Sequence, residues 1–142
     1  MHSETIRKLI ENGKIRVLDL PSKIEESMRN QTLLLKDDLD NVEILLERGK
    51  FRGAFIHAFN AYERAIDIFL IYKGYKVSDR YPRKILIGEL LGKEFLGDYE
   101  ELFEYRKNRM YDRLGIITGP EIKKLTEELV PRILEKSKVR LD

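Results

Sequence analysis

The chain has 142 residues, with 27 Lys and Arg against 25 Asp and Glu, and it contains no cysteine. This length supports one domain with a modest core. The balanced charge excludes a polycationic tail, so any contact with nucleic acid must come from a local patch. The absence of cysteine excludes disulfides, thiolate zinc sites and cysteine nucleophiles.

The chain shows no membrane or export signal. No apolar run approaches the roughly 20 residues of a membrane span, and the first residues lack a signal-peptide pattern. We therefore expect a soluble, cytoplasmic protein with no membrane partner. Its 37% of charged residues, with no cysteine, is a bias reported for proteins of thermophiles.

The first twenty residues are predicted to flank the main domain. A short helix is expected over 3–12, with Ser3 as its N-cap. The alternating stretch 15–18 is expected to be an extended arm rather than a sheet strand, because the sequence shows no partner strand. A single helical domain is then predicted over 21–142.

Helical periodicity dominates from residue 21 onward. One helix is predicted up to Gly49, because apolar residues recur at intervals of three, four and seven along a single stripe: Ile24, Met28, Leu35, Leu39, Val42 and Leu46. The next helix, 51–73, is apolar on most sides, which indicates a central position. Gly74 suits the position that follows a helix end.

Three shorter helical segments follow. They are predicted over 82–91, over 98–113 and from Pro120 onward, and Pro131 is expected to kink the last one. No βαβ alternation or hairpin signal is present. The sequence therefore predicts an all-α, up-and-down bundle of four main helices with short flanking helices.

The usual enzymatic and cofactor motifs are absent, so no metal or cofactor is expected. Asp37, Asp38 and Asp40 are interpreted as part of a solvent-exposed acidic face rather than a cation site. His57 lies on the central helix and could act as an acid or base. A hydrogen-bonded histidine at the edge of the core is the favoured interpretation.

The stretch 104–113 is the most informative, because it holds four cations within eight residues. Arginines bind phosphate with two parallel hydrogen bonds, and tyrosines stack on bases. The candidate phosphate-binding residues are Arg106, Asn108, Arg109, Tyr111 and Arg113. Arg106 shares a helix side with Phe103 and Met110, which is unusual for a surface charge. The alternative is an ion-paired arginine that packs between helices or subunits.

Two motifs resemble the HEPN family (higher eukaryotes and prokaryotes nucleotide-binding domains) over about residues 22–138. The first is the helix junction with Gly49, Phe51 and Ala54, and the second is the run Ala61-Tyr62-Glu63-Arg64-Ala65. The family's late motif, an arginine followed by a histidine, is matched by Arg106 and Tyr111. This is similar to a branch that carries tyrosine in place of the histidine.

The resemblance implies a two-fold dimer whose motif helices line a shared cleft, and it implies RNA or nucleotide as ligand. Some relatives cut RNA without metal, and others partner a small nucleotidyltransferase in toxin–antitoxin pairs. Tyr111 is a poor general base, because the ordinary pKa of tyrosine is near 10. Arg106 and Tyr111 are also about 140° apart on an ideal helix, so convergence would require a bent helix end or a second subunit.

Three functions are therefore kept open. The first is a dimeric nucleotide- or RNA-binding protein with little or no catalysis, in which Glu63 would anchor an arginine and His57 would support the site. The second is a metal-independent endoribonuclease that uses Arg106 with Tyr111, or His57 if it reaches the cleft. The third is a helical adaptor without a ligand.

Overall fold

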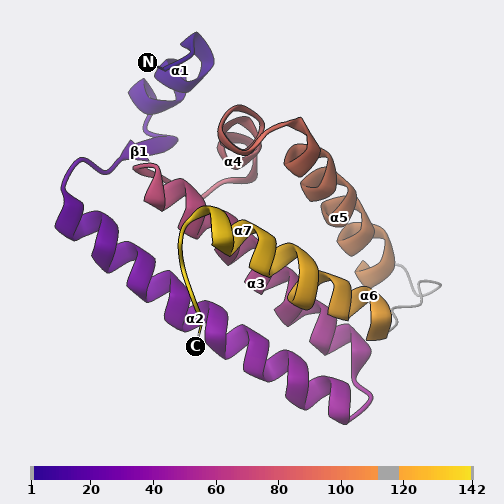
Figure 1. Cartoon of the computed structure of the whole chain (residues 1–142). Helices are drawn as coiled ribbons and strands as arrows, with labels where there is room; N and C mark the ends of the chain where they lie inside the picture. Colours follow the sequence, from indigo (N-terminus) through magenta and orange to yellow (C-terminus); the bar gives the residue numbers. More distant parts are fainter. Residues whose placement is uncertain (1, 112–118, 142) are drawn as a thin grey trace.

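The computed structural model describes residues 2–111 and 119–141, which form an all-α bundle with a small two-stranded sheet (Figure 1). Two long helices, α2 (Pro21–Glu47) and α3 (Phe51–Tyr72), pack against each other along their length. The last helix, α7 (Val130–Lys136), packs on α3. The predicted fold class is confirmed.

The α2–α3 pair forms where the sequence predicts it. Pro21 occupies the first position of α2, and the chain leaves that helix through Gly49, whose φ of 68° is in the left-handed region. The predicted apolar stripe of α2 faces α3, with Leu35 and Val42 buried. Helix α3 is central, as predicted, and Gly74 follows it with a φ of 96°.

The amino-terminal segment differs from the prediction. Helix α1 (Glu4–Glu11) begins as expected, with the Ser3 hydroxyl accepting a hydrogen bond of 3.2 Å from the Ile6 amide. The stretch after it forms strand β1 (Ile15–Val17), which pairs antiparallel with β2 (Tyr75–Val77). The expectation of an arm without a sheet partner is therefore wrong. The partner is only three residues long, too short to show a strand pattern in the sequence.

Two π turns occur in the later part of the chain, one between α4 and α5 and one between α6 and α7. Helix α4 (Arg80–Leu86) continues as a π turn, η1 (Ile87–Leu91), before α5 (Lys93–Tyr111), which begins earlier than predicted. Helix α6 (Gly119–Lys124) runs through a second π turn, η2 (Leu125–Leu129), into α7.

The second π turn explains how the chain accommodates Pro131. A proline has no amide hydrogen, and its ring collides with the carbonyl four residues earlier in an α-helix. A π turn shifts the hydrogen-bonding pattern by one residue. Pro131 consequently lies in the first turn of α7, directly after η2. The predicted disturbance is therefore present as a wider turn.

The core is rich in aromatic side chains that join α3 to α5. Tyr62, Phe59 and Phe55 from α3 are buried, and so is Tyr99 from α5. The Tyr62 and Tyr99 rings lie 6.2 Å apart between centroids. Among the described residues, no helix combines the length and apolar character needed to cross a membrane.

Candidate functional site

Arg106 projects from α5 onto the central helix. Its guanidinium lies 5.2 Å from the centroid of the Phe59 ring, and the side chain is half-buried. Within the described parts of the chain, Arg106 has no hydrogen bond or ion pair. The described residues therefore do not support the alternative in which a carboxylate of the same chain neutralises this arginine.

A second arginine lies on the neighbouring ring. The Phe59 ring meets the Phe103 ring edge-on at 6.3 Å, and the Arg80 guanidinium lies 3.7 Å from the centroid of Phe103. We call Arg80, Phe103, Phe59 and Arg106 the arginine–phenylalanine row. Arg80 was not predicted from the sequence. The available signal for it was the pair of arginines on either side of Pro82, near a predicted helix start.

Glu63 anchors an arginine, but that arginine is neither Arg106 nor Arg80. Its carboxylate lies 3.6 Å from Nη1 of Arg83 and accepts a hydrogen bond of 2.7 Å from the Tyr99 hydroxyl. Arg83 also donates two hydrogen bonds to Asp67, at 2.9 and 3.2 Å.

This cluster shares one cation between two carboxylates. Burial raises the pKa of Asp67, although Arg83 acts in the opposite direction. Burial and the adjacent Glu63 charge raise the pKa of Tyr99, which keeps its hydroxyl protonated as a donor. Glu63 and Asp67 are therefore already engaged with Arg83 and Tyr99.

His57 belongs to a different network, between α2 and α3. Its Nδ1 donates to Oδ1 of Asp38 at 2.9 Å, and Arg64 donates through Nε to Oδ2 of Asp38 at 2.8 Å. Nη1 of Arg64 also donates to Gln31 at 3.2 Å. Histidine hydrogen-bonded at the edge of the core was the favoured interpretation, and the geometry agrees with it.

Asp38 corrects the prediction of a uniformly exposed acidic face. Asp37 and Asp40 are exposed as expected, but Asp38 is only 7% exposed. A hydrophobicity pattern cannot anticipate this position, because burial of Asp38 depends on hydrogen-bond donors that α3 supplies from residues far along the chain.

The structure separates His57 from Arg106. His57 faces α2, whereas Phe59, which contacts Arg106, faces α5. Residues 57 and 59 point about 160° apart on an ideal helix. One chain therefore does not bring the histidine and the arginine into a common site.

The remaining candidates lie at the end of α5. Asn108 is exposed on that helix. Arg109 and Tyr111 also belong to α5, but their side chains lie outside the described part of the molecule. Arg113 falls outside the described residues altogether.

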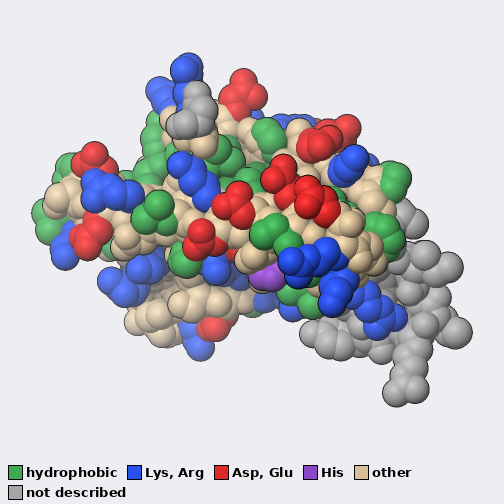
Figure 2. Space-filling model, turned by 90° about the horizontal axis from the view of Figure 1, so that it is seen from below, with side chains coloured by type: hydrophobic (Ala, Val, Ile, Leu, Met, Phe, Trp, Pro, Cys, Tyr) green, Lys and Arg blue, Asp and Glu red, His purple; other side chains and the backbone are tan. Residues whose placement is uncertain are grey.

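Cations gather near this end of the bundle. Arg48, Lys50 and Arg52, at the turn between α2 and α3, are all exposed, as is Lys107 on α5. The Phe55 ring, one turn into α3, lies 5.2 Å from the Tyr105 ring of α5, so the two cationic segments are neighbours. Figure 2 shows Lys and Arg side chains together at the end of the molecule where α2 passes into α3, whereas acidic side chains follow the middle of that face.

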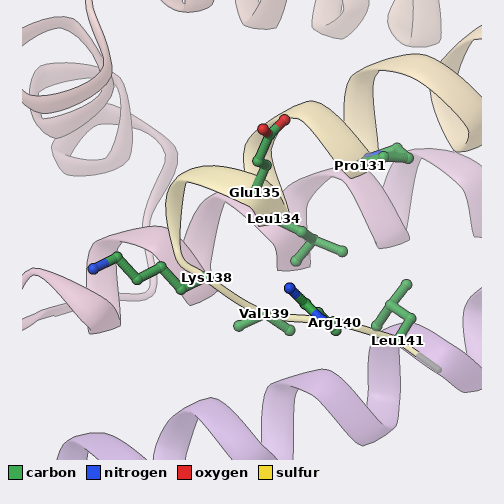
Figure 3. A pocket seen from close by; sticks show the side chains of 7 residues that line it. All are labelled: Pro131, Leu134, Glu135, Lys138, Val139, Arg140 and Leu141. Atoms are coloured by element: carbon green, nitrogen blue, oxygen red, sulfur yellow. The ribbon is translucent and has the colours of Figure 1, made fainter.

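Two cavities lie away from Arg106. One, of about 640 Å³, is bordered by apolar side chains of α7 and the segment after it, including Leu134 and Leu141 (Figure 3). The other, of about 500 Å³, lies between α5 and η2. Neither is lined by Arg106. Among the residues that are described, no group of histidines and carboxylates could hold a metal ion.

No protein-family model, curated protein or solved structure matches this sequence.

Proposed function

We propose that this chain is a HEPN-like helical protein that binds the phosphate of a nucleotide or RNA through Arg106, with little or no catalysis. The observation that carries the proposal is the half-buried Arg106 guanidinium, which lies against Phe59 without an acceptor among the described residues. An aromatic face orients a guanidinium. Its donors then remain available for bidentate hydrogen bonds to a phosphate.

The exposed cations at the α2–α3 turn favour a polyanion as ligand. Arg48, Lys50 and Arg52 extend the positive charge beyond Arg106. Cations that neutralise successive phosphates release counterions, so binding of an RNA strand should weaken steeply with salt.

The resemblance adds a proposed two-fold dimer, and a small nucleotidyltransferase as the partner in a toxin–antitoxin pair. A second subunit could place Arg106 and Tyr111 in one cleft, which a straight helix does not. Sedimentation equilibrium tests the dimer, and a molar mass that stays monomeric at high micromolar concentration would contradict it.

Equilibrium binding of a fluorescent oligoribonucleotide at several salt concentrations tests Arg106. For Arg106→Gln, we expect about tenfold weaker binding and a salt slope reduced by about one. Arg29→Gln is the matched control, since Arg29 is an exposed arginine near the other end of the α2–α3 pair. Unchanged affinity in Arg106→Gln would refute the proposed site.

The endoribonuclease alternative has one favourable observation. Asp38 holds His57 with Nδ1 as donor, which leaves Nε2 as the basic nitrogen. An RNA-cleavage assay in EDTA with wild type, Tyr111→Phe and His57→Gln tests it, because cleavage lost in either variant would favour an enzyme. The adaptor alternative predicts no RNA binding, and changes only in melting temperature or dimerisation.

A further inference from the structure

Arg80 has an unsatisfied hydrogen-bond donor. Its Nε atom is buried and lacks a hydrogen-bond partner, the one such side-chain atom among the described residues. Buried polar atoms in folded proteins almost always have partners, so an exception calls for an explanation such as a role in binding.

The Phe103 ring does not supply that partner. It lies 3.7 Å from the centre of the guanidinium, and its π electrons attract the charge of Arg80. The N–H groups of a guanidinium lie in the plane of the group and need an oxygen or nitrogen acceptor.

Two partly buried carboxylates of α3, Asp67 and Glu63, pair with a different arginine. Arg83 follows Arg80 by one turn of α4 and takes both Asp67 and Glu63 as partners. Glu63 also accepts from Tyr99. Arg80 has no ion pair with a described residue. The two arginines of this short helix thus differ: Arg83 is neutralised, whereas Arg80 has no counter-charge among the described residues.

The row therefore has at each end an arginine that forms no ion pair with any residue the structure describes. Arg80 contacts Phe103, Arg106 contacts Phe59, and the two rings contact each other. One phosphate on Arg106 would leave Arg80 still without a counter-ion from the described part of the chain.

We infer that Arg80 is a second anion-binding residue, so that the row binds a ligand with two neighbouring phosphate groups. The inference rests on the proposed function, in which Arg106 binds phosphate. The same chemistry is present in a nucleoside diphosphate and in successive linkages of an RNA strand. A single isolated phosphate would engage only one end of the row.

The Nε–H resonances of the arginines provide a direct test. In ¹H–¹⁵N spectra of the full chain, Arg80→Lys and Arg106→Lys variants assign the two signals by their loss. Titration with ADP or with an oligoribonucleotide should shift both signals together. Orthophosphate should shift these signals only at concentrations at least tenfold higher than those of ADP or the oligoribonucleotide. Tighter binding of ADP would identify the ligand as a free nucleotide, and tighter binding of the oligonucleotide would identify it as RNA. An Arg80 signal that no probe moves would overturn the inference.

Affinity measurements separate this inference from the proposed function. We expect Arg80→Gln and Arg106→Gln each to weaken binding of the preferred probe about tenfold, whereas Arg29→Gln should bind like wild type. Loss in Arg106→Gln alone would refute a role for Arg80 and leave the proposed function intact. Loss of affinity in Arg80→Gln alone would instead refute the proposed phosphate contact of Arg106. Should Arg80→Gln fail to fold, Arg80→Lys keeps the charge without the Nε donor and is expected to bind more weakly at an unchanged melting temperature.

Discussion

The Nε atom of Arg64 on α3 donates a hydrogen bond of 2.8 Å to Oδ2 of Asp38 on α2. The other oxygen of Asp38 accepts from His57, two turns earlier on α3, at 2.9 Å. One nearly buried carboxylate thus connects the two longest helices at two points. Polar contacts at a helix interface fix the register of the pair, since sliding by one turn would leave the carboxylate without donors.

Asp38→Ala should lower the free energy of unfolding by roughly 1–2 kcal/mol, since it leaves Arg64 and His57 without their shared acceptor. The effect is limited because the Arg64 side chain is 31% exposed to solvent, which screens the charge. Urea denaturation measures it. Asp37→Ala, at the exposed neighbouring position, should change stability by less than about 0.5 kcal/mol. Equal effects of the two substitutions would show that the Asp38 network contributes nothing.

Ile15→Ala should destabilise the chain by about 2–4 kcal/mol, because Ile15 is 1% exposed and its truncation opens a cavity beneath the sheet. The control is Val17→Ala on the same strand, where the side chain is 46% exposed. Thermal unfolding distinguishes the two variants. A melting temperature that stays at the wild-type value in Ile15→Ala would mean that the amino-terminal segment is not part of the core.

Lys138→Gly should stabilise the chain by about 0.5–1 kcal/mol. Lys138 follows α7 with a φ of 59°, a conformation that favours glycine. The amide of Val139 donates to the Leu134 carbonyl at 3.1 Å, so this helix end needs the left-handed residue. Lys138→Ala is the control, since it removes the amine but keeps Cβ and should bring no gain. If both variants gain equally by chemical denaturation, the backbone explanation fails.

Tyr62 and Tyr99 should not ionise in the folded chain under mildly alkaline conditions. Burial raises the pKa of each hydroxyl, and neighbouring negative charges add to the effect. A group whose pKa is higher in the folded state stabilises the fold below its unfolded pKa. That contribution is lost as the pH rises above about 10.

Absorbance at 295 nm during an alkaline titration measures tyrosine ionisation. We expect part of the signal to appear only together with the loss of helical circular dichroism. In Tyr99→Phe, this late fraction should shrink. Complete ionisation of all tyrosines before the helices unfold would contradict the prediction.

The helices were predictable because they follow from local rules. The apolar stripe of α2 is visible in the sequence alone, and so are Gly49 and Gly74 at the helix ends, where the structure has positive φ angles. The sheet was not predictable, since β1 and β2 have three residues each and are separated in the sequence by α2 and α3. A pattern of period two needs longer strands to be recognised.

The candidate site was predictable only in part. Arg106 stood out because it is a cation on a partly apolar helix side, and its contact with Phe59 agrees with that pattern. Arg80 comes from another helix, and its position on Phe103 depends on tertiary packing. The same limit applies to Asp38, whose burial is decided by donors on α3. Residue spacing within one helix carries no information about such contacts.

The pairing of Ile15 with Val77 has a consequence for the order of assembly. The partners are far apart along the chain, so direct closure in the unfolded state would sacrifice much chain entropy. Once α2 and α3 have folded against each other, Leu18 and Gly74 lie at the same end of the pair, where the Leu18 amide reaches the Gly74 carbonyl at 2.7 Å. The strands then have only a short distance to close. We therefore expect the amino-terminal strand to pair only after the α2–α3 hairpin has formed.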